Sequence, residues 1–284
     1  MFLPLVNDPL VTMLRIFALL FTVSQSAHFV PLDGGSPIHI CGMVGSPGRG
    51  KIFKGSVNST NCLEPSSELV VVKCDKEGSL DEEFKKSKSI SPIRNFVYDA
   101  VVALAQPDRV CFTMEYFGPS LASLRDKLTG THWPWDAISV LGMRLVSQLA
   151  EIHASGYAHR DLHFMNVVAR NRNVTDFESF MMQDPIIIDF GDAVELEHRE
   201  DANILIQNDL MAVLVGLKYL VEGDYKFYTE KKYGFNPKTA MDKSSGGICI
   251  DTPPSYCGIL TYMFSMKPSE TPDYGFIISE LTKY

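Results

Sequence analysis

The chain has 284 residues, of which 45% are hydrophobic and 21% are charged, and this is the composition of an ordinary globular protein. Such a length suffices for one large domain or for two lobes. The formal net charge of −8 and the lack of any basic run argue against a general nucleic-acid binder, because affinity for a phosphate backbone comes from clustered lysine and arginine. We therefore expect no nucleic acid among its partners.

The N-terminal segment has the pattern of a secretory signal peptide. Arg15 is followed by an apolar stretch up to Val23 that is too short to span a bilayer, and small residues follow up to Ala27. We therefore expect residues 1–27 to be a signal peptide that is cleaved near Ala27, and no stable membrane span. The alternative is an N-terminal helix that packs on the domain.

Sequons and cysteines also fit the secretory pathway. Asn58 and Asn173 each begin an acceptor sequence for N-glycosylation, and the six cysteines form an even number with no metal-ligand spacing. The cysteines could form disulfide bonds in an oxidising compartment, and they could equally be buried free thiols in a cytosolic protein. We expect a secretory or secreted protein, with a cytoplasmic one as the alternative. The pairing stays open, although Cys249 and Cys257 are close in sequence.

The first part of the chain predicts a small, mostly antiparallel sheet with one helix. Glycines between short apolar runs predict a β-hairpin over residues 38–55. Further apolar runs predict strands over 68–74, 96–104 and 109–116. The charged segment 80–90 predicts a short helix.

The second part predicts helices with a few short strands. Apolar residues at helical spacing predict a buried helix over 135–155, which Gly156 ends. Short strands are expected over 166–170 and 185–189. A helix is expected from about 208 to 221, and further helical segments reach the end. The fold class that follows is α+β.

Glycines in the first hairpin have the spacing of a loop that covers nucleotide phosphates. In a glycine-rich loop of the kinase type, which this stretch resembles, Gly45 and Gly50 would occupy the first and third glycine positions, and Ile52 would be the aliphatic residue that covers the base. Pro47 replaces the middle glycine, and it removes an N–H and stiffens the loop. An ordinary hairpin turn explains this stretch better when it is taken alone.

Lys73 ends the apolar strand VVVK, where a lysine can pair with the α- and β-phosphates of a nucleotide. Such a lysine needs a glutamate partner on the following helix. Glu83 fits best, because the apolar side of the helix then falls at buried positions. Glu82 is the alternative.

The strongest signal is a pair of loops in the second part. Residues 159–166 (HRDLHFMN) have the spacing H-R-D-x-x-x-x-N, and the sequence DFG follows at 189–191 after an apolar strand. In phosphoryl transfer, a carboxylate at Asp161 orients the acceptor hydroxyl. Asn166 and Asp189 are then the ligands that hold Mg²⁺ across the β- and γ-phosphates.

These motifs, in this order, resemble those of the protein kinase superfamily. The run MEYFGPSL at 114–121 is similar to the hinge of the casein kinase 1 family, and Pro272-Asp273-Tyr274 is similar to a motif in its closing helices. The resemblance covers residues 38–281. It implies a serine/threonine protein kinase that uses ATP and Mg²⁺, takes a protein substrate with a serine or threonine acceptor, and acts as a monomer.

The resemblance also implies a bilobal protein-kinase-like fold, with a small antiparallel β-rich N-lobe and a larger α-helical C-lobe. The domain would cover residues 36–284, divided into an N-lobe (36–114), a hinge (115–118) and a C-lobe (119–284). Three residue roles come with it. Met114 would gate the adenine pocket, the backbone from Glu115 to Phe117 would bind the adenine, and Asp209 would anchor the catalytic loop.

The segment between Gly191 and Asp209 departs from the family pattern. It is short, lacks the A-P-E motif and contains no serine, threonine or tyrosine, which excludes activation by phosphorylation in this stretch. Arg160 usually meets a phosphate there. We expect a carboxylate to supply a constant negative partner, and the candidates are Glu195, Glu197, Glu200 and Asp201.

His163 is a second departure, because serine/threonine kinases carry a lysine there that neutralises the γ-phosphate. Since histidine is fully charged only in acidic solution, we expect transfer to strengthen as the pH falls toward about 6 while Asp161 stays ionised.

Two alternative functions follow from these departures. The motifs D-L-H-x-x-N and I-D-F-G-D also look like those of small-molecule kinases related to aminoglycoside and choline phosphotransferases. A nucleotide-binding pseudokinase that acts as a binding protein is the other alternative. Against it stands the presence of all four expected catalytic positions, which are Lys73, Asp161, Asn166 and Asp189.

Overall fold

The computed structural model describes residues 28–31, 36–45, 50–57, 59, 62, 68–75, 80–94, 97–103, 106–127, 133–222, 249 and 251–283. The expected signal segment 1–27, Pro47 and Asn58 lie outside these residues. The described chain divides into two compact units. Unit 1 holds the residues up to Phe84 together with Asn95–Tyr116, and unit 2 holds Lys85–Arg94 and the residues from Phe117 onward.

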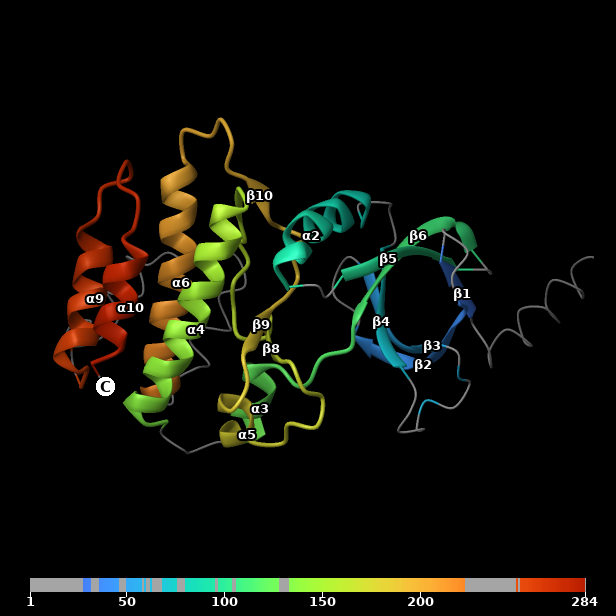
Figure 1. Ribbon diagram of the computed structural model, residues 1–284, viewed down its shortest axis with the longest axis horizontal. Coiled ribbons are helices and arrows are strands. Elements are labelled where there is room, and N and C mark those ends of the chain that lie inside the picture. Colours follow the sequence, from blue (N-terminus) through green and yellow to red (C-terminus); the bar gives the residue numbers. More distant parts are fainter. Residues whose placement is uncertain are drawn as a thin grey trace, which may run out of the picture. The chain divides into compact units, whose positions relative to one another are not determined.

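Unit 1 is a closed antiparallel barrel with the strand order β1-β2-β3-β4-β6-β5 (Figure 1). Its strands are β1 (His28–Pro31), β2 (Ile38–Gly45), β3 (Gly50–Val57), β4 (Glu68–Asp75), β5 (Val97–Ala103) and β6 (Gln106–Glu115). The five strands from β2 onward were predicted from the sequence. β1 was not, and it closes the barrel by pairing with both β2 and β5. The barrel therefore includes residues upstream of the expected start at residue 36.

The core of the barrel, in its described part, contains β-branched and aromatic side chains together with the disulfide bond between Cys74 and Cys111. Ile38, Val70 and Val72 are at most 3% exposed, and Phe29 packs against them from β1. Burial of such side chains stabilises a sheet by about 1.5–3 kcal/mol each. Helix α2 (Leu80–Arg94) follows β4, and it runs four residues beyond the predicted end.

Unit 2 consists mainly of helices, with two short two-stranded sheets. Its elements are α3 (Leu121–Lys127), α4 (Trp135–Ala154), β7 (Tyr157–Ala158), β8 (Val167–Ala169), α5 (Phe177–Met181), β9 (Pro185–Ile187), β10 (Val194–Glu195), α6 (Ala202–Glu222), α9 (Pro254–Ser265) and α10 (Tyr274–Leu281). β7 pairs with β10, and β8 pairs with β9. Helix α4 packs against α6 and α10, and α9 packs against the same two helices (Figure 1).

Helix α4 is the centre of this helical packing, as its apolar stripe predicted. Five side chains of the stripe are at most 2% exposed: Ile138, Leu141, Leu145, Leu149 and Ile152. Gly142 lets the neighbouring helices approach, because a Cβ atom there would lie 3.0 Å from Leu217 Cδ1 and 3.3 Å from Leu281 Cδ1. The helix ends at Ala154, and Gly156 leaves it with a φ of 88°, a conformation that favours glycine.

Helix α6 starts at Ala202, several residues before its predicted start. Asp201 accepts from Leu205 N at 3.1 Å, so the first turn forms upstream of the apolar stretch on which the prediction relied. By length and hydropathy, Ala202–Val221 could cross a membrane. Of that window, 61% is buried within the structure, as in the core helix of a folded protein.

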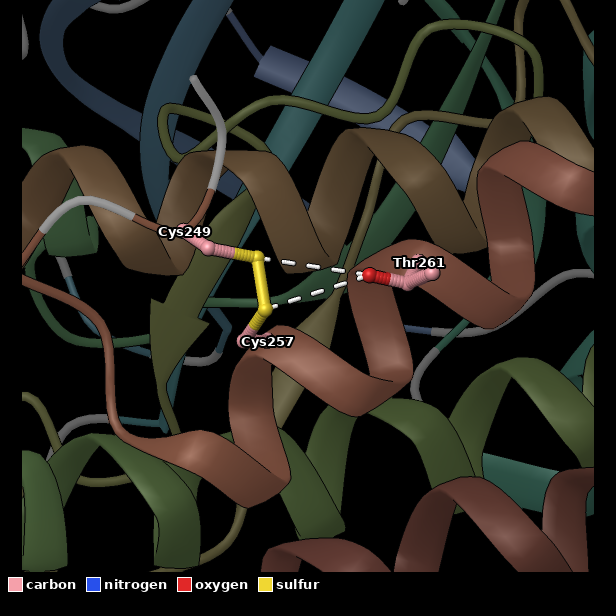
Figure 2. Close-up of a disulfide and its surroundings, with 3 residues drawn as sticks. All are labelled: Cys249, Cys257 and Thr261. Atoms are coloured by element: carbon pink, nitrogen blue, oxygen red, sulfur yellow. Dashed lines mark hydrogen bonds between the residues drawn. A yellow bond between two sulfur atoms is a disulfide. The ribbon is translucent and has the colours of Figure 1, made fainter. Parts of the chain in front are cut away.

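Three disulfide bonds pair all six cysteines. They join Cys41 to Cys62, Cys74 to Cys111, and Cys249 to Cys257, with Cα–Cα distances of 5.7, 4.4 and 5.1 Å. The second bond crosses directly opposite positions of β4 and β6. The third ties Cys249 to the first turn of α9, one turn before Thr261 (Figure 2). Of the two expectations for the cysteines, the structure therefore has the paired one.

Candidate active site

The loop at 159–166 joins β7 to β8 in unit 2, and the sequence DFG at 189–191 follows β9. The register of β8 and β9 pairs Val167 with Ile187. One step beyond, Ile188 N donates to Asn166 O at 2.9 Å. The two expected metal ligands, Asn166 and Asp189, therefore lie at the same end of a two-stranded ladder, although they are far apart in sequence.

A buried carboxylate on α6 holds the backbone of the first loop. Asp209 is 3% exposed, and its two oxygens accept from His159 N at 2.6 Å and from Arg160 N at 2.9 Å. Arg160 has a φ of 67°, and Asp189 has a φ of 68°. Such values cost energy in residues other than glycine, so surrounding bonds must maintain them. Asp209 therefore anchors the loop at 159–166, as expected from the sequence.

His159 connects the two loops. Its side chain is fully buried, and its ring lies 5.1 Å from the ring of Phe190. Asp161 N donates to His159 Nδ1 at 3.3 Å, so Nδ1 accepts. The proton of the neutral ring is then on Nε2, which donates to Ile188 O at 3.0 Å. A shift of either loop would break one of these bonds.

Asp161, His163 and Asn166 form one cluster. Asn166 Nδ2 donates to Asp161 O at 2.9 Å, so Oδ1 is the atom of this amide that could bind a metal ion. His163 Nε2 lies 3.3 Å from Asn166 Nδ2 and 3.6 Å from Asp161 Oδ2. The side chain of Asp161 is 40% exposed, so an acceptor can reach its carboxylate. His163 therefore lies between the expected base and the expected metal ligand.

Gln148 on α4, which was not among the candidates selected from the sequence, positions β9. It is 3% exposed, and its Nε2 donates to Pro185 O. Its Oε1 accepts from Ile187 N at 3.3 Å. A buried glutamine on an apolar helical stripe is the one signal that could have identified it, because buried polar side chains need partners.

The expected nucleotide-binding residues of unit 1 form a row across the barrel. The strand register places Gly45 opposite Ile52, and Ile52 opposite Lys73. Gly50 opens the same strand, β3. The three strands thus bring together residues that the sequence pattern assigned to one phosphate-binding site.

Lys73 forms an ion pair with Glu83 on α2, with 2.6 Å between Nζ and Oε1. The two side chains are 13% and 10% exposed, so water screens the pair only weakly. Glu82 is exposed. Of the two glutamates considered, Glu83 is therefore the partner of Lys73.

Near the boundary of the units, Met114 is 7% exposed and faces Val71 across β4 and β6. Glu115 ends β6, and Phe117, which is 8% exposed, begins the described part of unit 2 after the barrel. Gly118 N donates to Ala169 O at 2.8 Å. This attaches the segment after the expected hinge to β8.

The short segment after β9 presents charges near Arg160, which is exposed. Arg199 binds both carboxylate oxygens of Asp201, at 2.8 and 2.9 Å. These bonds hold the pKa of Asp201 below its usual value, and the charge of Arg160 adds a smaller lowering. Glu195 accepts instead from Tyr157 Oη at 3.2 Å. Asp201, one of the four candidate carboxylates, thus lies within reach of the charge of Arg160.

The described residues contain no group of three or more His, Cys, Asp or Glu side chains that could hold a metal ion. One amide and one carboxylate, Asn166 and Asp189, would need phosphate oxygens to complete a coordination shell. No protein-family model matches this chain, and no curated protein matches it either.

Proposed function

We propose that this chain is a phosphotransferase of the protein kinase type, which transfers a phosphoryl group from ATP to a hydroxyl. The observation that carries the proposal is the ladder of β8 and β9, with Asn166 and Asp189 at one end and Asp161 in the loop that Asp209 anchors. On this proposal the mixed α and β units described above are the two lobes of a protein-kinase-like fold.

Each expected role has a residue whose local geometry suits it. Asp161 is accessible and next to His163, so it can orient the acceptor hydroxyl and take its proton. Lys73 donates from its ammonium group to Glu83, which holds the group in place. A cation that binds the α- and β-phosphates must be held in this way. As the acceptor oxygen bonds to the γ-phosphorus, the bond to the β-phosphate oxygen breaks and ADP leaves.

Mg²⁺ fits the donor atoms of the site. Asn166 Oδ1 and the Asp189 carboxylate are hard oxygen donors, and Mg²⁺ is commonly bound by one or two protein oxygens together with phosphates and water. The Nδ2 atom of Asn166 already donates to Asp161 O, which orients Oδ1 as an acceptor. When bound, the ion would neutralise charge on the β- and γ-phosphates.

The substrate we favour is a serine or threonine hydroxyl of a protein, with the hinge run and the closing helices as support. A second candidate is a small-molecule acceptor. His163 favours it, because this ring takes the place of a lysine between Asp161 and Asn166. The segment between Gly191 and Asp209 favours it as well, since it is shorter than the activation segment of protein kinases and so leaves less chain to grip a polypeptide.

We further infer that the protein folds in the secretory pathway. Three disulfide bonds pair every cysteine, and such bonds persist in oxidising compartments. Asn173 is exposed, so a glycan could be attached there without disturbing the core.

The experiment is a comparison of acceptors. Purified protein with ATP and Mg²⁺ is offered an acidic protein such as casein, and separately aminoglycosides and choline, and transfer of labelled phosphate is measured. Labelling of casein supports the first proposal, and labelling of a small molecule alone supports the second. Mg²⁺-dependent thermal stabilisation by ATP without transfer to any acceptor would contradict both, and would favour the pseudokinase.

A further inference from the structure

A buried chain of hydrogen bonds connects α10 to the candidate catalytic loop. The hydroxyl of Tyr274, the first residue of α10, contacts His153 Nδ1 in the last turn of α4. His153 Nε2 lies 3.0 Å from Asp209 Oδ2, and the same oxygen accepts from His159 N at 2.6 Å. His153 and Asp209 are 8% and 3% exposed. Water therefore has little access to the middle of this chain.

The chemistry of the three groups fixes the direction of the bonds. The Asp209 carboxylate can only accept, so His153 Nε2 must carry the proton. Nδ1 of the neutral ring then accepts, and the Tyr274 hydroxyl donates to it. Burial and the charge of Asp209 raise the pKa of Tyr274, so its phenol remains a donor.

Oδ2 of Asp209 thus accepts two hydrogen bonds, one from His153 Nε2 and one from the loop backbone at His159 N. Without the hydroxyl, Nδ1 would lose its hydrogen bond, and the ring would be held by the bond from Nε2 alone. A ring that rotates would no longer fix Oδ2, and Asp209 could then shift away from His159 N. Arg160, with its φ of 67°, depends on the other oxygen of Asp209 and would be affected next.

We propose that Tyr274 is a positioning residue for the candidate catalytic loop: its hydroxyl fixes the orientation of the His153 ring and thereby the carboxylate of Asp209. This inference rests on the proposed function for its effect on catalysis. Its structural part concerns only unit 2, where all the residues involved lie.

The test uses Tyr274→Phe, which keeps the ring against His153 and removes only the hydroxyl. Tyr262→Phe is the matched control, because the hydroxyl of Tyr262 accepts from Asp273 N at 2.8 Å beside the same helix, α10. Two quantities are measured in the full-length protein. They are kcat and KM for ATP, and the hydrogen-exchange rates of the amides of His159 and Arg160.

We expect Tyr274→Phe to lower kcat about tenfold with little change in KM for ATP, because a misplaced base affects transfer more than nucleotide binding. The two amides should exchange faster. Tyr262→Phe should change neither quantity. In His153→Gln the imidazole that bonds to Tyr274 is gone, so Tyr274→Phe should have little further effect on that background.

Two results would overturn the proposal. One is a Tyr274→Phe protein with the wild-type kcat and wild-type exchange, and the other is an equal loss in both tyrosine variants, which would indicate packing of α10 alone. If the wild type transfers no phosphate, the proposed function fails. The exchange of the two amides then still decides whether Tyr274 positions the loop.

Discussion

At the scale of single residues, one buried carboxylate determines the shape of the candidate active site. Asp209 accepts from two consecutive backbone N–H groups, one of which belongs to a residue with positive φ. It also faces His153 at 3.0 Å. A side chain with one acceptor oxygen cannot satisfy all three donors.

We therefore expect Asp209→Asn to lower the free energy of unfolding by about 1–3 kcal/mol, since a buried donor would lose its partner. Asp184→Asn is the control. Its side chain is 71% exposed, and its nearest cation, Arg144 Nε, is 3.7 Å away. Urea denaturation measures both variants, and equal stability of the two would contradict the role given to Asp209.

The ion pair between Lys73 and Glu83 in unit 1 can be tested by comparing two adjacent glutamates that differ in burial. Glu83 contacts Lys73 at 2.6 Å, whereas Glu82 is exposed. Glu83→Gln should reduce the thermal stabilisation given by ATP with Mg²⁺, because Lys73 is no longer held in place. Glu82→Gln should retain it. The same reduction in both variants would show that α2 acts through its overall charge.

The raised pKa of Tyr274 also predicts how the stability of the protein changes in alkaline solution. Its folded-state pKa is raised above the unfolded value of about 10, so its contribution to stability is complete below pH 10 and is lost as the pH rises further. Wild-type protein should therefore lose stability faster than Tyr274→Phe above about pH 10. Thermal melting across that range is the measurement, and parallel curves for the two proteins would be the contrary result.

At the scale of elements, the segment after the expected hinge depends on a close approach to the backbone beyond β8. A Cβ atom at Gly118 would collide with Asn171 O, a backbone atom that cannot move away as a side chain can. Gly258 in α9 is different, because a Cβ atom there would have no neighbour within 4 Å.

Gly118→Ala should therefore destabilise the protein by about 1–3 kcal/mol, the usual cost of overpacking. Gly258→Ala should stabilise it by up to about 1 kcal/mol, because alanine is the better helix former. In thermal melting, the midpoint temperature should fall for Gly118→Ala and rise for Gly258→Ala. A neutral Gly118→Ala would show that the chain adjusts at this point.

The predictability of these elements from the sequence depended on how each is stabilised. The strands from β2 to β6 and helix α4 carry their own hydrophobic periodicity, so they could be located before the structure was known. Strand β1 has only four residues, and pairing with β2 and β5 defines it. The start of α6 was missed because Ala202–Gln207 precedes its buried stretch.

Motif spacing selected Asp161, Asn166 and Asp189 as candidates, because phosphoryl transfer needs these residue types. It could not find Gln148 or the bond between Tyr274 and His153, since these depend on how helices cross. Glu83 could be preferred over Glu82 only through the burial pattern of its helix, in which Ser87 and Ile90 are buried as predicted and Phe84 is partly buried.

At the scale of the whole molecule, three disulfide bonds reinforce the fold. Their sequence separations are 21, 37 and 8 residues. On a chain-entropy model each such bond contributes about 2–4 kcal/mol, and the longer loop contributes more. The pairing of Cys74 with Cys111 could not be predicted from the sequence, because the register of β4 and β6 brings these two cysteines together.

Removing the bond between Cys74 and Cys111 by double alanine substitution should lower the stability more than removing the bond between Cys249 and Cys257. The difference expected from loop length is about 1 kcal/mol. Thermal melting of both variants without reductant measures it. Mass spectrometry after alkylation without reduction should find no labelled cysteine, and labelled wild-type protein would contradict the proposed pairing.

The central claim is phosphoryl transfer with Asp161 as the base, and Asp161→Asn tests it most directly. Asparagine keeps the size of the side chain and cannot take the proton of the acceptor. With labelled ATP and Mg²⁺, we expect both proteins to be stabilised by the nucleotide, and transfer by the variant to fall at least about a hundredfold. Equal transfer by the two proteins, or none by the wild type to any acceptor, would contradict the claim.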